Sequence, residues 1–228
     1  MSYFDFHSHI LPGIDDGAQT VQTSYKMLQM LHNQGVEKVV FTPHFWPEAM
    51  DFDTFCINRD GALKKLAAGY DSKTMPEFFV GAEVKIMPKV SKFDLSKFSF
   101  KDNYILCEMP AIYGDWILNE LETIMLRGYK IIFAHIERPL MEFSKSDFKK
   151  LIDYRSFTYQ LNVEALKSMA LRRYFVGEYN KHGGRFILGS DAHGVDDRKP
   201  EFDAKALKKR SMKEFMDAVY QNSKNILG

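Results

Sequence analysis

The stretch FDFHSHILPGIDDGA, residues 4–18, places two histidines and three aspartates within fifteen positions near the N-terminus. Phenylalanines alternate with Asp5 and His7 as they would on a buried strand, because successive side chains of a strand point to opposite faces. The polar partners in this alternation can ionise, and an Asp-Asp-Gly turn follows them. The stretch therefore predicts a strand that ends at a chemical site, followed by a turn that delivers a further carboxylate.

Similar strand patterns recur along the chain, and longer helical patterns lie between most of them. Helical segments end in glycine before the next strand at Gly35, at Gly128 and at the Gly183-Gly184 pair, as helix C-termini commonly do. Strands that alternate with helices predict a parallel α/β fold, either a barrel or an open doubly wound sheet. The seven predicted strands cover residues 3–7, 37–43, 77–82, 104–109, 130–135, 157–162 and 185–190.

The ends of these strands carry ionisable or amide side chains, and five of the chain's seven histidines fall there. In a barrel the C-terminal ends of the strands meet at one mouth, whereas an open sheet would spread them along an edge. The pattern favours a distorted (β/α)7 TIM-like barrel with a site at the C-terminal ends of its strands. The residues are His7, His9, His44, Glu83, Glu108, His135, Asn162, Asp191 and His193.

The residue types at these ends are those of a metal site. His7 and His9 are two positions apart, as are Asp191 and His193, so each pair projects from one side of an extended strand. Imidazole nitrogens and carboxylate oxygens without thiolates suit manganese, iron or zinc in a catalytic rather than a structural site. Any one of these histidines could be a structural residue, but the set together predicts metal binding.

Seven motifs occur in order from the N-terminus to about Pro200: DFHSHILPGIDDGA, FTPH, GAEV, ILCEM, FAHIER, QLN and LGSDAH. Together they resemble the PHP superfamily (polymerase and histidinol phosphatase). HSHILPGIDDGA and AHIER are most similar to one branch, the bacterial manganese-dependent tyrosine-protein phosphatases of capsular and exopolysaccharide loci. The resemblance implies the PHP fold and three divalent metal ions, expected to be Mn²⁺ with iron or zinc as alternatives.

The resemblance also implies a set of ligands for each ion, and every position has the expected residue type. The first ion would be held by His7, His9, Glu83 and Asp191. The second would share Glu83 and add Glu108 and His135. The third would be held by Asp16, His44 and His193.

The implied activity is hydrolysis of a phosphomonoester by a protein-tyrosine phosphatase that regulates capsule or exopolysaccharide biosynthesis, with a metal-bridging hydroxide attacking phosphate in line. The expected partner is a phosphotyrosine protein, such as a bacterial tyrosine kinase of polysaccharide export, or a small phosphomonoester. Three divalent ions and four carboxylates leave the centre with a net charge of about +2, which suits a phosphate dianion. We expect Arg138 and Arg198 to bind phosphate oxygens, because a guanidinium fork matches them.

Residues next to these positions are expected to have supporting roles. Asp5 is expected to fix a histidine tautomer, and Asp15 to be a turn residue. Phe45 and Trp46 could flank a phenyl ring or pack over the barrel rim, while Glu48 would disfavour acidic sequences around a phosphotyrosine.

Several other functions stay open. A small-molecule phosphatase, such as a histidinol phosphatase, is the main alternative. The residue pattern of TatD-like nucleases does not include Asp16, His44 and His193. An amidohydrolase would need a strand-end lysine as a metal bridge, which no predicted strand supplies. A PHP module without catalysis would have lost ligands, and none is lost here.

Composition sets the remaining expectations. The chain has 228 residues, 45% of them hydrophobic, which fits a single domain over residues 1–228. Lys and Arg number 31 against 30 acids, so no nucleic-acid partner is expected. Neither a leader peptide nor a long apolar run is recognisable, which predicts a cytoplasmic protein without membrane insertion. Cys56 and Cys107 lie in apolar settings and are expected to be free thiols.

Overall fold

The computed structural model describes residues 2–154, 156–182 and 185–228. Its strands pair in parallel with their neighbours, as the sequence predicts. One sheet has the order β1-β2-β4 and the other the order β3-β5-β6-β7-β8-β9. The strands are β1 (Tyr3–Ser8), β2 (Val36–Phe41), β3 (His44–Phe45), β4 (Glu77–Val80), β5 (Glu83–Lys85), β6 (Tyr104–Glu108), β7 (Lys130–Phe133), β8 (Thr158–Asn162) and β9 (Phe186–Gly189).

Two of the predicted strands end early, and each is followed by a short separate strand. The strand predicted over 37–43 ends as β2 at Phe41, and β3 begins at His44 after Pro43, which has no N–H to donate to the ladder. The strand predicted over 77–82 ends as β4 at Val80, and β5 begins at Glu83; Gly81 lies in this break, where a Cβ atom would lie 2.8 Å from the Phe100 ring. Backbone hydrogen bonds nevertheless cross both breaks, from Gly81 N to Phe41 O and from Glu83 N to Pro43 O.

The free edges of the two sheets also touch beyond the named strands. Asp191 N donates to His7 O at 2.8 Å, and His9 N donates to Ala192 O at 3.0 Å, so the end of β1 lies beside the segment after β9. These contacts bring the C-terminal ends of β1 and β9 together, although the strands themselves belong to different sheets.

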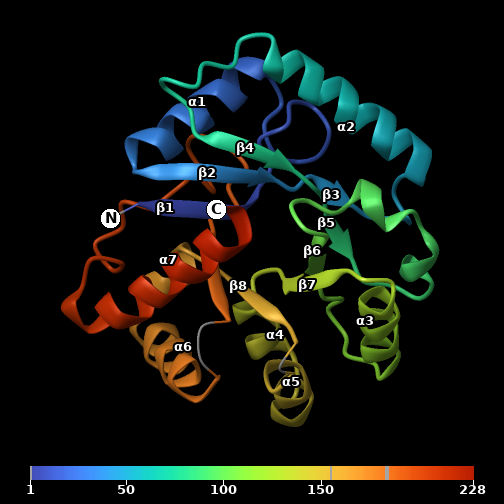
Figure 1. The fold of residues 1–228 in the computed structure, drawn as a ribbon, viewed down its shortest axis with the longest axis vertical. Coiled ribbons are helices and arrows are strands. Elements are labelled where there is room, and N and C mark those ends of the chain that lie inside the picture. Colours follow the sequence, from blue (N-terminus) through green and yellow to red (C-terminus); the bar gives the residue numbers. More distant parts are fainter. Residues whose placement is uncertain (1, 155, 183–184) are drawn as a thin grey trace.

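Helices surround the strands, as Figure 1 shows. Thr20 and Asp51 accept hydrogen bonds from Thr23 N and Thr54 N as N-caps. Gly35 and Gly128 have φ of 85° and 87°, which confirms their predicted place after a helix; the Gly183-Gly184 pair lies outside the described residues. The α-helices are α1 (Val21–Asn33), α2 (Phe52–Ala67), α3 (Trp116–Leu126), α4 (Glu137–Glu142), α5 (Lys145–Ile152), α6 (Met169–His182) and α7 (Lys213–Leu227). Short 3₁₀ helices are η1 (Val90–Lys92), η2 (Leu95–Lys97), η3 (Glu164–Lys167) and η4 (Arg210–Met212).

The apolar side chains form two clusters. The larger one packs helices against the outer faces of the strands. The smaller one gathers residues from five strands and closes on the end of α7, where Lys38 Nζ also donates to Leu227 O. Its buried members are Phe4, Phe6, Val40, Phe100, Leu106, Ile132, Ala134, Ile187, Ile226 and Leu227.

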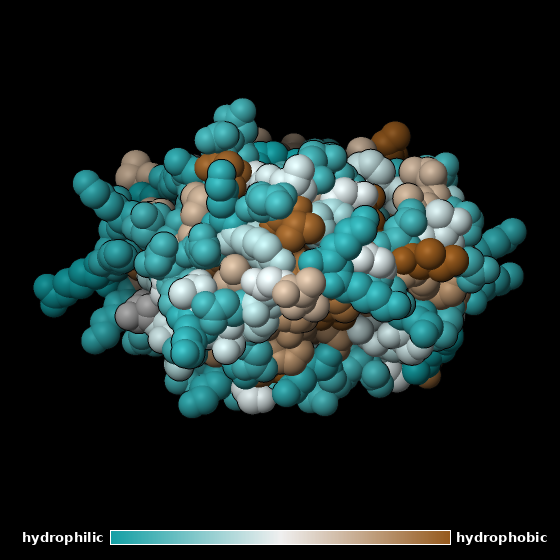
Figure 2. All heavy atoms as spheres, turned by 90° about the horizontal axis from the view of Figure 1, so that it is seen from above, coloured by the Kyte–Doolittle hydropathy of each residue, from teal (hydrophilic) through white to brown (hydrophobic). Residues whose placement is uncertain are grey.

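The surface is mostly hydrophilic on the face seen in Figure 2, where apolar side chains appear in small groups. Across the part of the chain that the structure describes, no helix is both long and apolar enough to cross a bilayer. Both cysteines are free thiols as expected, with Cys107 buried and Cys56 only partly so.

Candidate metal centre

All nine residues predicted as ligands come together in one place. Their nitrogen and oxygen atoms form four overlapping groups, in each of which the ligand atoms lie within 4.8 Å of one another. The groups are His9, Asp16, His44 and His193; His7, Glu83 and His135; His7, His9 and Asp191; and His44, Glu83 and Glu108. The prediction that these residues end strands holds closely for His7 in β1 and Glu108 in β6. The short strands β3 and β5 instead begin with His44 and Glu83. The segments after β1, β7 and β9 supply the others, which are His9, Asp16, His135, Asp191 and His193.

Four buried side chains, His7, His9, Glu83 and Asp191, form what we term the inner group. The Nε2 atoms of His7 and His9 are 3.1 Å apart, and Glu83 Oε2 lies 3.1 Å from the first and 3.4 Å from the second. Asp191 Oδ1 lies 3.6 Å and 3.5 Å from the same two nitrogens. Four atoms bound tetrahedrally to one ion at about 2.1 Å would be about 3.4 Å apart. The inner group therefore has the spacing of ligands around a single ion.

Glu83 turns its two oxygens toward different neighbours. Oε2 faces the inner histidines and also lies 2.8 Å from His44 Nδ1. Oε1 lies 2.9 Å from His135 Nε2, and Glu108 Oε1 lies 3.8 Å from that nitrogen. A carboxylate divided in this way can bridge two ions, which is the sharing that the resemblance implies.

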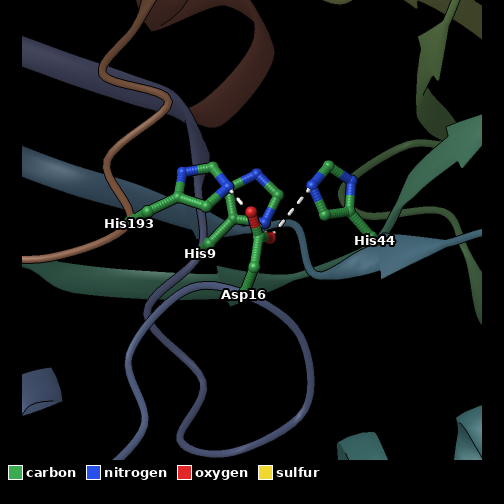
Figure 3. A group of neighbouring side chains, drawn as sticks. All are labelled: His9, Asp16, His44 and His193. Carbon is green, nitrogen blue, oxygen red and sulfur yellow. Dashed lines mark ion pairs between the residues drawn. The ribbon is translucent and has the colours of Figure 1, made fainter. Parts of the chain in front are cut away.

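Asp16, His44 and His193 form an outer group next to His9, shown in Figure 3. Asp16 Oδ1 lies 3.4 Å from His44 Nε2 and 3.3 Å from His193 Nε2, and its carboxylate reaches from the loop between the two rings. The His9 ring stacks on the His193 ring with centroids 3.9 Å apart. His9 thus lies at the border between the inner and outer groups.

Several buried polar atoms of the centre lack a hydrogen bond among the described residues, although such atoms are almost always paired in folded proteins. They are His44 Nδ1, Glu83 Oε2, His135 Nδ1 and His193 Nε2. Glu83 Oε2 has three nitrogens nearby, but none meets it with hydrogen-bond geometry. Three of these atoms face other candidate ligands: His44 Nδ1 lies 2.8 Å from Glu83 Oε2, and His193 Nε2 lies 3.3 Å from Asp16 Oδ1. Unpaired acceptor atoms this close together suit a cation. The residues present fit a metal centre.

The histidines around the buried carboxyls keep them ionised, which metal binding requires. Burial opposes ionisation of Glu83, but the charge of His7 and the contacts with His135 hold its pKa well below the usual range. Burial likewise opposes ionisation of Asp191, and His7 and His9 lower its pKa against that effect.

Left-handed backbone occurs at three residues of the centre and its edge, as it does at four non-glycine residues elsewhere in the described part of the chain. His135 and Asp191 have φ of 32° and 51°, and Arg198 has φ of 48°, all in the left-handed region that residues other than glycine rarely adopt. Such conformations are commonly held at functional sites by the surrounding structure. In this chain they turn two of the candidate ligands toward the centre.

Asp15 and Asp5 hold the centre in ways that the sequence predicts only in part. Asp15 is a turn residue, since its Oδ1 accepts from Gly17 N, but its Oδ2 also contacts His9 Nδ1 at 2.8 Å. Burial raises the pKa of Asp15, and the hydrogen bond to His9 outweighs it and lowers the value to about 2. The expectation that Asp5 fixes a histidine tautomer is wrong, because its carboxylate accepts from His7 N and from Ser190 instead.

Gln160 is a residue of the site that sequence reasoning missed. Its Oε1 lies 3.0 Å from His7 Nδ1, the contact that the sequence suggests for Asp5. Its Nε2 lies 2.9 Å from Asn162 Oδ1, and Asn162 Nδ2 in turn lies 3.2 Å from Asp191 Oδ2. A signal was available, since Gln160 is a polar residue inside an apolar strand, two positions before Asn162 and so on the same side.

Both arginines reach the edge of the centre. Arg138 donates to Asp191 Oδ2, and Arg198 donates to Asp191 Oδ1 at 3.1 Å and to Asp16 Oδ2 at 3.4 Å. Their side chains are 39% and 43% exposed, so each guanidinium has one side on the centre and the other in solvent.

Phe45, the last residue of β3, and Trp46, which follows it, lie in different environments. Phe45 is fully buried among Phe52, Phe55, Phe93 and Phe98, so it cannot flank a substrate ring and packs in the core instead. Trp46 is 37% exposed, its ring lies 4.4 Å from the His44 ring, and its Nε1 donates to Glu108 Oε2. We refer to Arg138, Arg198 and Trp46, which are all partly exposed, as the rim.

One further expectation needs correction, because β5 does end in a lysine. Lys85 does not bridge metals, since its ammonium group pairs with Glu48 and lies over the Trp46 ring, 5.6 Å from its centroid. The charge of Glu48 is accordingly paired within the chain, which weakens the expected effect on acidic substrates.

The sequence matches a family model described as capsular polysaccharide synthesis, CpsB/CapC, over residues 3–228. Tyrosine-protein phosphatase CpsB of Streptococcus agalactiae is 28% identical over 229 residues, which cover 90% of this chain and 88% of the relative. Tyrosine-protein phosphatase YwqE of Bacillus subtilis is 27% identical over 218 residues, covering 85% and 78%.

Solved structures support the fold. Crystal structures of YwqE from Bacillus subtilis and CpsB from Streptococcus pneumoniae are described as those of metal-dependent tyrosine phosphatases, and the matching chain superposes with a TM-score of 0.75. The match covers 98% of this chain and 94% of the other at 24% identity. A lactonase from Listeria monocytogenes, 10% identical, superposes with a TM-score of 0.55 over 99% of this chain and 90% of its own, so the fold is shared beyond the phosphatases.

Proposed function

The chain belongs to the CpsB/CapC family of capsular polysaccharide synthesis proteins, and on that premise we propose that it is a metal-dependent protein-tyrosine phosphatase. Its relatives in several bacteria are named tyrosine-protein phosphatases. That favours this activity over hydrolysis of histidinol phosphate or another small phosphomonoester, and over a TatD-like nuclease.

The observation that carries the proposal is the set of atoms around Glu83. Its Oε2 is directed at the inner histidines while its Oε1 is directed at His135, so one buried carboxylate connects neighbouring groups of candidate ligands. We propose three divalent ions, expected to be Mn²⁺. The inner group would hold one, Glu83 with Glu108 and His135 a second, and Asp16, His44 and His193 a third.

When bound, such ions lower the pKa of an attacking water and stabilise charge on phosphoryl oxygens. The chain's own residues would supply position and charge balance. With four carboxylates among the ligands, a three-ion centre would keep a net charge of about +2, which suits a phosphate monoester dianion. Asp15 holds the His9 ring in place through Nδ1, so that the His9 Nε2 atom stays directed into the centre.

The rim is suited to recognition of the substrate. Arg138 and Arg198 can exchange part of their contact with Asp191 for phosphate oxygens, because each guanidinium has several donors in a planar fork. Trp46 offers a partly exposed aromatic face beside His44 for the phenyl ring of phosphotyrosine.

We extend the proposal to the fold and the partner. The contacts between the edges of the two sheets support a single domain that forms a distorted seven-stranded barrel, with β2 and β3 as one broken strand and β4 and β5 as another. The partner would be a phosphotyrosine protein of capsule or exopolysaccharide production, such as its tyrosine kinase, in a cytoplasmic setting.

Kinetics with a substrate panel test the proposed activity. The protein, supplied with Mn²⁺, is assayed against phosphotyrosine peptides, phosphoserine peptides of the same sequence, histidinol phosphate and sugar phosphates. We expect kcat/KM to be highest for phosphotyrosine peptides, because a phosphoserine side chain is too short to reach the centre past the rim. Faster turnover of histidinol phosphate or a sugar phosphate would overturn the assignment to phosphotyrosine.

A further inference from the structure

The amide of Gln160 is the part of the site with no assigned role. Gln160 is fully buried in β8 between Tyr159 and Leu161, in a position where an apolar residue would pack. Its side chain contacts three partners: His135 N at 2.7 Å, His7 Nδ1 at 3.0 Å and Asn162 Oδ1 at 2.9 Å. Both polar atoms of the amide therefore have partners.

One of these contacts fixes the direction of the others. The backbone N–H of His135 can only donate, so the atom that faces it must be the acceptor, Oε1. The same Oε1 faces His7 Nδ1, which therefore has to carry the hydrogen. A neutral His7 then has its lone pair on Nε2, the atom directed at His9, Glu83 and Asp191.

The other end of the amide continues the chain of donors. Gln160 Nε2 donates to Asn162 Oδ1, and the amide nitrogen of Asn162 is then free to donate to Asp191 Oδ2 at 3.2 Å. Asn162 and Arg138 both donate to Oδ2 of Asp191, and Oδ1 faces His7 and His9 with Arg198 at its outer side. Both ends of the network thus terminate on members of the inner group.

We propose that Gln160 is the positioning residue of the inner metal site: it sets the tautomer of His7 and, through Asn162, the orientation of Asp191. The inference rests on the proposed metallophosphatase function. In this role a neutral amide does for His7 what the charged carboxylate of Asp15 does for His9.

Packing leaves the amide little freedom to turn. A Cβ atom on Gly189 in β9 would lie 2.6 Å from Gln160 Nε2 and 2.6 Å from His7 Cβ. Gly189 pairs with Asn162 across the two strands, so the absent side chain provides the space that the amide fills. The glycine and the glutamine together fix the His7 ring.

The first measurement is metal affinity. Zn²⁺ and Mn²⁺ are titrated separately into chelator-treated protein against a chromophoric competitor. For Gln160→Leu we expect binding at the tightest site to weaken about 10- to 100-fold, as happens when partners of metal-binding histidines are lost. Gln34→Leu is the matched control, because it likewise removes an amide whose two polar atoms have partners. Those partners, Pro200 O and Phe202 N, lie outside the centre. The control should leave the affinity unchanged.

The second measurement separates positioning from general damage. In zinc-loaded, ¹⁵N-histidine-labelled protein, the Nδ1 proton of His7 should give a slowly exchanging signal, which is assigned by its loss in His7→Asn. Gln160→Leu should lose that signal. Gln160→Glu keeps an acceptor for His7 and should retain it, with a smaller loss of affinity than Gln160→Leu. Asn162→Ala should keep the signal and still weaken binding, because only the Asp191 end is broken.

The outcomes distinguish two kinds of failure. If the wild-type protein binds neither metal, the proposed function itself fails. If it binds metal but Gln160→Leu and Asn162→Ala bind as tightly within twofold, or if Gln160→Glu loses the His7 signal, the role assigned to Gln160 is wrong. Should Gln160→Leu not fold, the milder Gln160→Glu and Asn162→Ala variants decide the question.

Discussion

The inner group and the rim are adjacent but have different surroundings. His7, His9 and Glu83 are fully buried and contact one another at separations typical of metal ligands, whereas Arg138 and Trp46 are more than a third exposed. A buried charged group without a partner is costly, so the side chains of the inner group depend on one another and on the ion that we propose they bind. The rim can change its contacts with little effect on the fold. We therefore expect metal binding to depend on the first region and substrate recognition on the second.

The largest effect should follow a change in the inner group. Asp191→Ala removes a candidate ligand that also accepts hydrogen bonds from both arginines, so we expect metal affinity to fall more than about 100-fold and activity to be lost. Elemental analysis after purification in Mn²⁺ measures the metal that is retained, and hydrolysis of para-nitrophenyl phosphate measures the activity. Asp196→Ala, which removes a carboxylate from the same loop, is the matched control. Normal metal content in Asp191→Ala would remove the distinction between the two regions.

Arg138→Ala should have the next largest effect. Loss of a donor to the transferring phosphoryl group costs about 100-fold or more in turnover in comparable sites, while the ligands stay in place. We expect lower kcat and weaker inhibition by inorganic phosphate, with unchanged metal content. Arg173→Ala, an exposed arginine of α6, should behave as the wild type. Metal loss in Arg138→Ala would instead assign the arginine to the support of Asp191.

Arg198→Ala should behave in the same way but more mildly. Its contacts with Asp191 and Asp16 are 3.1 Å and 3.4 Å long and come from a loop, so we expect a loss in kcat/KM of about 10-fold, or roughly 1.4 kcal/mol. In the double variant Arg138→Ala/Arg198→Ala, the fold-loss in kcat/KM should be smaller than the product of the two single fold-losses, because both arginines contact Asp191. A larger effect than that of Arg138→Ala would make Arg198 the main phosphate-binding arginine instead.

The smallest effect concerns the two neighbouring aromatic residues. Trp46→Ala should raise KM for aryl phosphates relative to alkyl phosphates by about 2- to 10-fold, the value of one aromatic contact, and Trp46→Phe should restore most of it. Phe45→Ala should leave that ratio unchanged and instead lower the free energy of unfolding by about 3–5 kcal/mol, since Phe45 lies in the core. Equal changes in KM for both substrate classes would exclude Trp46 from substrate binding.

Most of the candidate ligands could be predicted because the sequence marks them twice. Each follows an apolar run that is recognisable as a strand, and each is ionisable where a packing residue would be expected; His44 and His135 are examples. The parallel α/β class follows from the same alternation. The end of β2 before Pro43 has a local signal in the proline. The break at Gly81 has none, because the contact between Gly81 and Phe100 joins segments distant in sequence.

Contacts that depend on side-chain direction could not be predicted. Asp5 is on the same strand as His7 and is the partner that the local sequence suggests for its ring, but the ring contacts Gln160, 153 positions away. Phe45 and Trp46 are adjacent in sequence and turn to opposite environments, one to the core and one to the rim. Local pattern gives the residue type, whereas tertiary packing decides which partner it meets.

The number of metal ions that the wild-type protein retains shows whether the nine candidate ligands form one metal centre. The protein is stripped with a chelator, reloaded with Mn²⁺, freed of excess metal and measured by elemental analysis against protein concentration from amino-acid analysis. A centre built by the nine candidate ligands should retain between about two and three ions per chain. Retention of no ion or of only one ion per chain at full loading would contradict a three-ion centre built by these residues.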